Sequence, residues 1–173
     1  MQPTENSGQL SLIQTKGSLD WAYPAMILAS TARVMDRDVH LFFTFYGLRC
    51  LLKDTKSLKV SPVGNPGMPI HLPFGPSRLR QFDFRQIMPD LVWGLPGMTS
   101  FATWAFKKQL KQQGQVSFEE LRDLCIEMGV KMTACEMSIE LMGWRHSDFI
   151  DGIDFAGAAT YFASSPERQS LFI

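Results

Sequence analysis

The sequence predicts an α/β fold, a three-layer sandwich with a mostly parallel sheet and helices on both faces. Short apolar runs alternate along the chain with segments of helical periodicity, which is typical of strands joined by helical crossovers. The run 39–45 is apolar nearly throughout, as buried parallel strands are. The chain has 173 residues, 45% hydrophobic and 20% charged, enough for one domain that buries roughly 70% of its unfolded surface.

The first part of the chain predicts two strands, each followed by a helical segment. Asp20 lies in an early-turn position of the first helix, where a carboxylate is favourable. In order we expect a strand over 10–15, a turn at 16–18, a helix over 19–35, a strand over 39–45 and a helix-like segment over 46–53.

The middle of the chain lacks periodicity and is predicted to be a long insertion, at about 57–97. Seven of the ten prolines fall between Pro62 and Pro96, together with several glycines. Segments of this length without regular structure are commonly functional or mobile. We therefore predict a flexible tail over 1–8 and a single domain over 9–173 that carries this insertion.

Regular structure returns after the insertion. Ser117 and Glu120 form a capping-box pattern at the start of one helix, and Gly129 suits its end. In order we expect helices over 98–113 and 118–128, a strand over 130–134, a short helix ending at 142, a connector over 143–152, a short strand over 153–155 and a terminal helix over 156–164.

Cys135 is the most informative residue, because it follows a short apolar run and precedes a helix-compatible segment. This pattern places it where a strand passes into a helix, at the carboxyl edge of the sheet. Unpaired backbone N–H groups and the helix dipole favour an anion there, and such a position can lower a cysteine pKa from about 8.5 to about 3.5–7.5. Cys135 is therefore a candidate nucleophile or sulfur carrier; the alternative is inert packing.

Three loops should meet at that edge, because ligands of parallel sheets bind outside the carboxyl ends of the strands. The loops are 16–19, 45–48 and 134–138. A Ser138 hydroxyl or amide suits a bond to a thiolate or bound persulfide, whereas a carboxylate at Glu136 opposes a thiolate. The candidate substrate-contacting residues are Gly17 and Ser18, which resemble an anion-binding turn, with Gly47, Glu136, Met137 and Ser138.

The other cysteines and the histidines have structural interpretations beside functional ones. Cys125 lies in the apolar stripe of its predicted helix, so packing is its default role and a second, resolving thiol is the alternative. Cys50 lies in an apolar stretch and is expected to pack. His40, inside a strand, is expected to be structural, while His71 and His146 are candidates to meet the thiol.

Composition and motif content argue against several functional classes. Lys+Arg and Asp+Glu are both 17, which leaves no electrostatic footprint for nucleic acid. The cysteine spacings fit neither zinc nor a disulfide framework, and nucleotide-binding glycine motifs are absent. We therefore expect no cofactor and no metal. Free thiols and an amino terminus without signal-peptide features indicate the cytoplasm.

Residues 87–106 are rich in apolar side chains and carry no charge after Asp90. Pro89, Gly94 and Pro96 interrupt the run, so a continuous membrane span is not favoured. We expect an oligomer interface, a contact with a membrane surface or a mobile lid, since surplus apolar surface usually meets a partner.

With these residues placed, the chain resembles the DsrE/DsrF-like family of small sulfur-transfer proteins, and most closely its "peroxiredoxin-like" DsrE subgroup from sulfur-oxidising prokaryotes. The resemblance covers about 10–162. It rests on 133–138 (TACEMS) with 141–143 (LMG), on 42–45 (FFTF) with 47–48 (GL), and on 151–152 (DG) followed by 156–161 (AGAATY).

The resemblance implies a flavodoxin-like sandwich that assembles into homo-oligomers. It implies that Cys135 carries sulfur as a persulfide or thiosulfonate, and that Cys125 matches a second cysteine found in some members. The implied partners are TusA-like sulfur carriers and rhodaneses. The expected function is thus a cofactor-free sulfurtransferase or sulfur carrier. The alternatives are an oligomeric small-anion binding module without catalysis and a thiol peroxidase.

Overall fold

The computed structural model describes residues 8–63, 65, 74–76, 78, 82–84, 90–164 and 168–173. Its contacts divide the chain into two compact units, one made of residues 1–58 with 118–173 and the other of residues 59–117. Each unit is treated by itself below. The first holds the sheet and all three cysteines.

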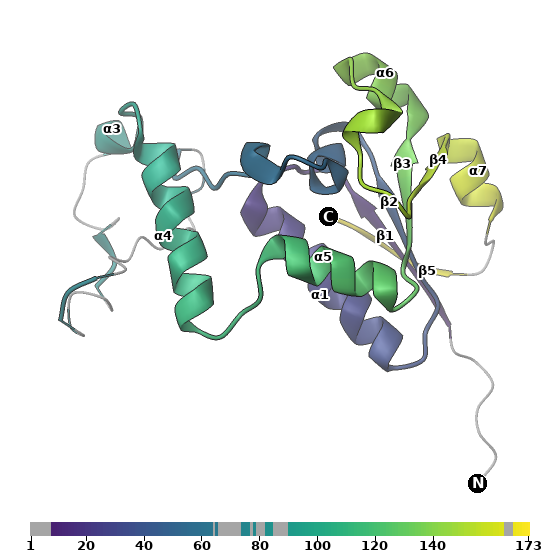
Figure 1. The fold of residues 1–173 in the computed structure, drawn as a ribbon, viewed down its shortest axis with the longest axis horizontal. Helices are drawn as coiled ribbons and strands as arrows, with labels where there is room; N and C mark the ends of the chain where they lie inside the picture. The colour runs from purple at the N-terminus through teal and green to yellow at the C-terminus, as the bar shows by residue number, and fades with distance from the viewer. Residues whose placement is uncertain are drawn as a thin grey trace, which may run out of the picture. The chain divides into compact units, whose positions relative to one another are not determined.

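The first unit is built on a five-stranded sheet in the order β4-β3-β2-β1-β5. Every pairing is parallel, as Figure 1 shows, so the predicted α/β class with a parallel sheet is confirmed. The strands are β1 (Gln9–Gln14), β2 (Val39–Phe43), β3 (Lys131–Cys135), β4 (Asp154–Ala156) and β5 (Arg168–Phe172).

One face of the sheet is apolar and is covered by α1 (Leu19–Val34) and α5 (Phe118–Glu127), which pack against each other (Figure 1). Alternate residues of a strand point to opposite faces, and the register aligns Leu12, Leu41 and Met132 in one row. All three side chains are buried. This row forms the centre of the hydrophobic core.

The opposite face is more polar and is covered by the short helix α7 (Ala158–Ala163). The ring of Tyr161 stacks on Phe42 with 4.5 Å between centroids, and its hydroxyl shares a hydrogen bond with the buried Ser11 hydroxyl. His40 and Thr133 lie on the same face and are also buried. Polar groups are therefore enclosed on this face through hydrogen bonds to one another, as buried polar groups require.

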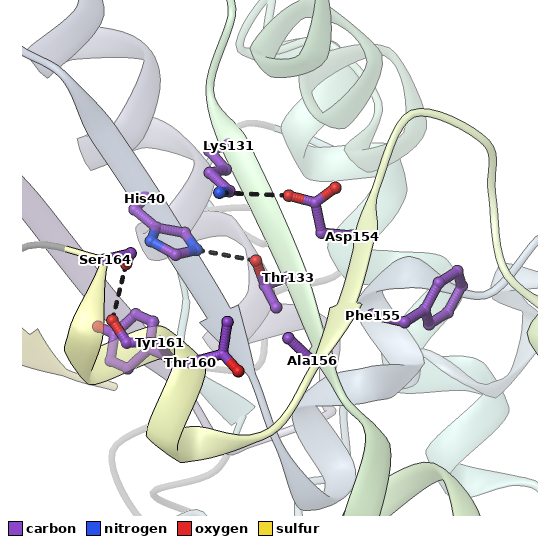
Figure 2. A pocket seen from close by; sticks show the side chains of 9 residues that line it. All are labelled: His40, Lys131, Thr133, Asp154, Phe155, Ala156, Thr160, Tyr161 and Ser164. Atoms are coloured by element: carbon purple, nitrogen blue, oxygen red, sulfur yellow. Dashed lines mark hydrogen bonds and ion pairs between the residues drawn. The ribbon is translucent and has the colours of Figure 1, made fainter.

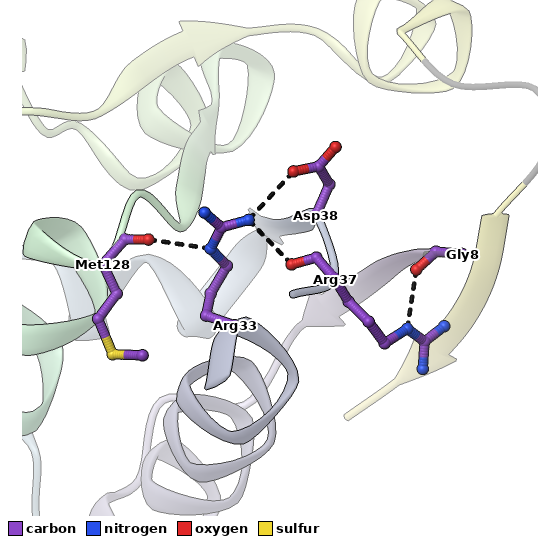
Figure 3. Close-up of polar contacts among 5 residues, drawn as sticks. All are labelled: Gly8, Arg33, Arg37, Asp38 and Met128. Atoms are coloured by element: carbon purple, nitrogen blue, oxygen red, sulfur yellow. Dashed lines mark hydrogen bonds and ion pairs between the residues drawn. The ribbon is translucent and has the colours of Figure 1, made fainter. Parts of the chain in front are cut away.

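Two arginines fasten the amino-terminal edge of the sheet, as Figure 3 shows. Arg33 Nε donates to the Met128 carbonyl at 2.9 Å, and its Nη1 donates to the Arg37 carbonyl and to Asp38. Arg37 Nε donates to the Gly8 carbonyl at 2.8 Å. These bonds tie the end of α1 to the end of α5 and to the start of β1.

The helix-like segment predicted over 46–53 is confirmed as a 3₁₀ helix, η1 (Phe45–Leu51). Gly47 lies close to the end of β1, and its N–H donates to the carbonyl of Thr15, the residue after the strand. The remaining short elements of this unit are η2 (Thr55–Ser57), α6 (Glu136–Met142) and η4 (His146–Asp148).

The chain does not end on the helix that the sequence predicts as terminal. Strand β5 follows α7 and pairs with β1, more than 150 residues away in the sequence. Its apolar residues are confined to the last positions, Leu171 to Ile173, which is too short a run to indicate a strand locally. The pairing depends on the exposed side of β1, which only the assembled sheet provides.

The second unit contains α3 (Asp90–Trp93) and α4 (Met98–Gln112), and α4 confirms the helix predicted over 98–113. Thr103 accepts from the Val60 N–H at 2.9 Å, which fixes the start of the unit against α4. Much of the insertion predicted at about 57–97, His71 included, lies outside the described residues. The insertion therefore stays a prediction.

Candidate functional site

Three loops meet at the carboxyl edge of β1, β2 and β3. The Gly47 N–H at the start of η1 donates to the Thr15 carbonyl beyond β1 at 2.8 Å. The hydroxyls of Thr44, after β2, and Ser138, in α6, are 2.8 Å apart. The convergence expected of a parallel sheet is thus present, and it brings the Cys135 junction next to the other two loops.

Two glycines make this convergence sterically possible. A Cβ atom at Gly17 would lie 1.9 Å from the Tyr46 carbonyl oxygen, and one at Gly47 would lie 2.2 Å from the Gln14 carbonyl oxygen. Contacts this short are not found for real Cβ atoms. Gly17 and Gly47 therefore act in close backbone packing. Ser18 is the N-cap residue of α1, and its side chain makes no capping hydrogen bond.

Cys135 ends β3 and is the N-cap residue of α6, as the sequence predicts. Its side chain is 7% exposed and packs with Phe42, Tyr161 and the partly buried Ile13. The thiol makes no capping hydrogen bond to the first turn of α6. The junction is therefore as expected, but its surroundings are aromatic and aliphatic, and the expected amide contacts to sulfur are not made.

The residues after Cys135 point in three different directions. The Glu136 carboxylate accepts a hydrogen bond from His146 Nε2 at 2.9 Å, and the His146 ring stacks on Phe155. Met137 is 77% exposed, whereas Ser138 is buried. The Glu136 carboxylate is therefore engaged with His146, and His146 packs on Phe155 rather than meeting the thiol.

The other two thiols are completely buried. Burial raises the pKa of Cys125 to about 11 and that of Cys50 to about 12. The Cys125 thiol also donates to the Met26 carbonyl of α1, with 3.4 Å between sulfur and oxygen. A protonated, enclosed thiol is a poor nucleophile, so this environment favours packing for both residues.

A hollow with a volume of about 220 Å³ lies under α7, on the face of the sheet that carries Cys135 (Figure 2). His40 Nε2 and the Thr133 hydroxyl are 2.8 Å apart on its floor, and Lys131 Nζ lies 3.4 Å from the Asp154 carboxylate. The lining residues are His40, Lys131, Thr133, Asp154, Phe155, Ala156, Thr160, Tyr161 and Ser164.

The hollow adjoins Cys135 through two of its lining residues. Ala156 pairs with Cys135 across β3 and β4, and Tyr161 packs against Cys135. Sequence reasoning missed Tyr161 as part of the site. The sequence does contain a signal: Tyr161 directly follows a run of small residues, 156–160. A large side chain at that position is expected to be buried, and a buried tyrosine hydroxyl usually needs a hydrogen-bond partner.

Metal and membrane chemistry receive no support from the described parts of the chain. Among the residues with described positions, no group of three His, Cys, Asp or Glu side chains has the arrangement of a metal site. The described helices include none with the length and apolar character needed to cross a bilayer.

Comparisons with known proteins agree with this architecture. Residues 6–171 match the model of the DsrE/DsrF/DrsH-like family. The chain is 47% identical over 161 residues to "Sulfur carrier protein DsrE2" of Allochromatium vinosum, covering 93% of this chain and 94% of that protein. It is 27% identical over 178 residues to "Uncharacterized protein YrkE" of Bacillus subtilis, covering 98% and 99%.

The fold also matches a solved structure. The YchN protein of E. coli superimposes with a TM-score of 0.55 at 9% identity, covering 96% of this chain and 99% of that one, which supports the fold alone. The match to the family model spans almost the whole chain, and the close relative covers it at high identity. This protein belongs to the DsrE/DsrF/DrsH-like family.

Proposed function

We propose that this protein is a sulfur carrier that holds sulfur on Cys135 and passes it to a partner protein. The observation that carries the proposal is the contrast among its three thiols. Cys50 and Cys125 are 0% exposed with raised pKa values, whereas Cys135 retains 7% exposure at a strand-to-helix junction. The relative at 47% identity, named a sulfur carrier protein, supports the same role.

The chemistry is thiol–disulfide exchange at sulfur. The Cys135 thiolate attacks the outer sulfur of a persulfide donor, R–S–SH, so that a new S–S bond forms on Cys135 while the S–S bond of the donor breaks. The donor leaves as a thiolate, which takes up a proton. No external oxidant or reductant is needed. A thiosulfonate is the second form in which Cys135 would hold sulfur.

Transfer onward requires a partner thiol at the same sulfur, and exposed apolar side chains surround the junction. Met137 and Leu141 of α6 are 77% and 67% exposed, and Phe45 and Tyr46 of η1 are 51% and 57% exposed. The bond between Thr44 and Ser138 joins these two elements. We infer that this surface docks a thiol-bearing carrier of the TusA or rhodanese type; homo-oligomer formation remains a separate prediction.

Mass spectrometry after incubation with polysulfide or tetrathionate tests the proposal. The wild-type protein should gain sulfur or a thiosulfonate group, and Cys135→Ser should lose the adduct completely. Cys125→Ser and Cys50→Ala should keep it. An adduct that disappears with Cys125→Ser would make Cys125 part of the chemistry. Failure to find an adduct on any cysteine would favour the small-anion binding module and would reject the carrier.

The docking surface has its own test. Leu141→Lys should slow sulfur transfer from loaded protein to a TusA-like acceptor, because it places a charge in an apolar contact. Leu124 of α5 is 42% exposed and lies away from the junction, so Leu124→Lys is the matched control. Equal transfer rates for the two variants would argue against docking through α6.

A further inference from the structure

We propose that His146 is a positioning residue for the sulfur chemistry of Cys135, because its hydrogen bond holds the Glu136 carboxylate on the side of the sheet away from the thiol. The inference rests on the proposed function and adds a residue to it. Glu136 directly follows Cys135 and is the first residue of α6. A carboxylate close to the thiol would oppose the thiolate that the chemistry needs.

The imidazole of His146 is itself fixed by an aromatic contact. Its Nε2 donates to Glu136 Oε2 at 2.9 Å. Its ring stacks on Phe155, with 4.0 Å between the centroids and 12° between the planes, and Phe155 contacts the buried Phe149 edge to face. A polar contact between exposed side chains is weakly held when it stands alone. Here stacking already restricts the imidazole, so less freedom is lost when the hydrogen bond forms.

The register shows on which side of the sheet this contact lies. Phe155 of β4 pairs with Ala134 of β3, and the next residue, Ala156, pairs with Cys135. Since neighbouring residues of a strand point to opposite faces, Phe155 points away from the α7 face, on which Cys135 lies. Figure 2 shows the Phe155 ring turned away from Ala156. A carboxylate bonded to the imidazole on Phe155 is therefore held away from the Cys135 sulfur.

Loss of this hydrogen bond would release the carboxylate beside the thiol. The Cα atoms of Cys135 and Glu136 are about 3.8 Å apart across a trans peptide, and the glutamate side chain can then adopt other rotamers. A carboxylate within about 4–6 Å of the sulfur disfavours both the thiolate and a bound persulfide anion. The Cys135 side chain is 7% exposed, so water screens this repulsion only in part.

The test is the rate at which iodoacetamide, a neutral reagent that reacts with thiolates, alkylates Cys135 between about pH 6 and about pH 10. His146→Ala should lower the rate at about pH 7 about threefold and move the midpoint of the pH profile upward, because the released carboxylate opposes the thiolate. Peptide mass spectrometry reports each cysteine separately. Cys50 and Cys125 are 0% exposed and should stay unmodified, which shows that the variant is folded.

A second substitution identifies the group through which His146 acts. Glu136→Gln removes the carboxylate, so adding His146→Ala to Glu136→Gln should leave the rate of alkylation unchanged. Arg145→Gln is the matched control for the loss of a basic side chain, because Arg145 adjoins His146 and its side chain is 83% exposed. It should keep the wild-type rate. A threefold loss caused by His146→Ala in the Glu136→Gln background, or by Arg145→Gln alone, would overturn the inference.

Loading with polysulfide separates this inference from the proposed function. If wild-type Cys135 gains sulfur and His146→Ala changes neither the rate of loading nor the rate of alkylation, the positioning role is overturned and the carrier stands. If wild-type Cys135 gains no sulfur, the carrier is overturned, and this role of His146 with it.

Discussion

The two faces of the sheet differ in what their residues contribute. The face under α1 and α5 carries rows of buried apolar side chains, such as Leu12, Leu41 and Met132. The face under α7 carries Ser11, His40, Thr133 and Lys131, and ends in Cys135. Both faces are formed by alternate residues of the same strands.

The two faces of the sheet therefore differ in role: the face under α1 and α5 stabilises the fold, and the face under α7 carries the groups of the candidate site. The largely apolar face, which also includes the buried Gln14 at the end of β1, depends mainly on complementary packing, whereas a buried polar face must satisfy each donor and acceptor. The second face does so with pairs such as His40 with Thr133 and Tyr161 with Ser11. The same face also carries the hollow lined by Lys131 and Asp154, which adjoins Cys135 through Ala156 and Tyr161.

The largest expected change in the free energy of unfolding comes from a substitution on the apolar face. Phe43 is fully buried there, and Phe43→Ala should lower the free energy of unfolding by about 3–5 kcal/mol, because it leaves a cavity in the core. Phe162 of α7 is 63% exposed, so Phe162→Ala should change it by less than about 0.5 kcal/mol. Urea denaturation measures both; similar losses would show that the faces do not differ as described.

Alkaline pH should weaken the apolar side through its two buried thiols. The pKa values of Cys50 and Cys125 are raised from 9.0 to about 12 and about 11, so the folded protein keeps protons that the unfolded chain releases. The stability from these thiols is fully present below the unfolded pKa, and it is lost as the pH rises from the unfolded pKa toward the folded values. Between about pH 8 and about pH 10 the free energy of unfolding should fall by about 3 kcal/mol.

The control for the alkaline effect is the double variant Cys50→Ala/Cys125→Ala. It lacks both thiols and should lose less stability than the wild-type protein over the same pH interval. A slope as steep as that of the wild type would assign the pH dependence to other groups. Denaturant titration at each pH provides the measurement.

Gly17→Ala should disturb the contact between the loop after β1 and the start of η1, at the carboxyl edge of the sheet. The added Cβ would meet the Tyr46 carbonyl oxygen at 1.9 Å, so the loops must separate, at a cost of about 1–3 kcal/mol in the free energy of unfolding. Gly157→Ala is the matched control, since nothing lies within 4 Å of its added Cβ. A neutral Gly17→Ala would mean that the two loops are not held together.

An effect on stability of similar size is expected on the polar face. Thr133→Val keeps the shape of the side chain but removes the hydroxyl that pairs with His40 at 2.8 Å, which should cost about 1–3 kcal/mol because a buried ring nitrogen loses its partner. Thr31 of α1 is exposed, and Thr31→Val should cost less. An unchanged His40 ring signal by NMR in Thr133→Val would contradict the pairing.

Local sequence patterns predicted most of the first unit's elements. The bounds of β1, β2, α1 and α5 agree with the prediction to within one or two residues, because these segments are long or strongly apolar. Strand β5 and the 3₁₀ character of η1 were not predicted. Both depend on contacts with β1, which a local pattern does not contain.

The candidate site was likewise predicted only in part from local sequence patterns. The position of Cys135 at a strand-to-helix junction followed from the sequence, because an apolar run ending at one cysteine before a helix is a local feature. Its environment did not. The enclosure by Phe42 and Tyr161, the pairing of Glu136 with His146 and the hollow beside Ala156 join residues from separate segments.

The sequence by itself determined the parallel α/β class, the order of its main elements and the residue that ends β3. Hydrophobic periodicity and turn residues act over neighbouring positions, so they can be read directly from the chain. Only the tertiary structure decided which thiols are enclosed, which polar groups pair, and which charges lie near Cys135. Those properties arise from the register of the strands and from helix packing, which bring distant residues within bonding distance.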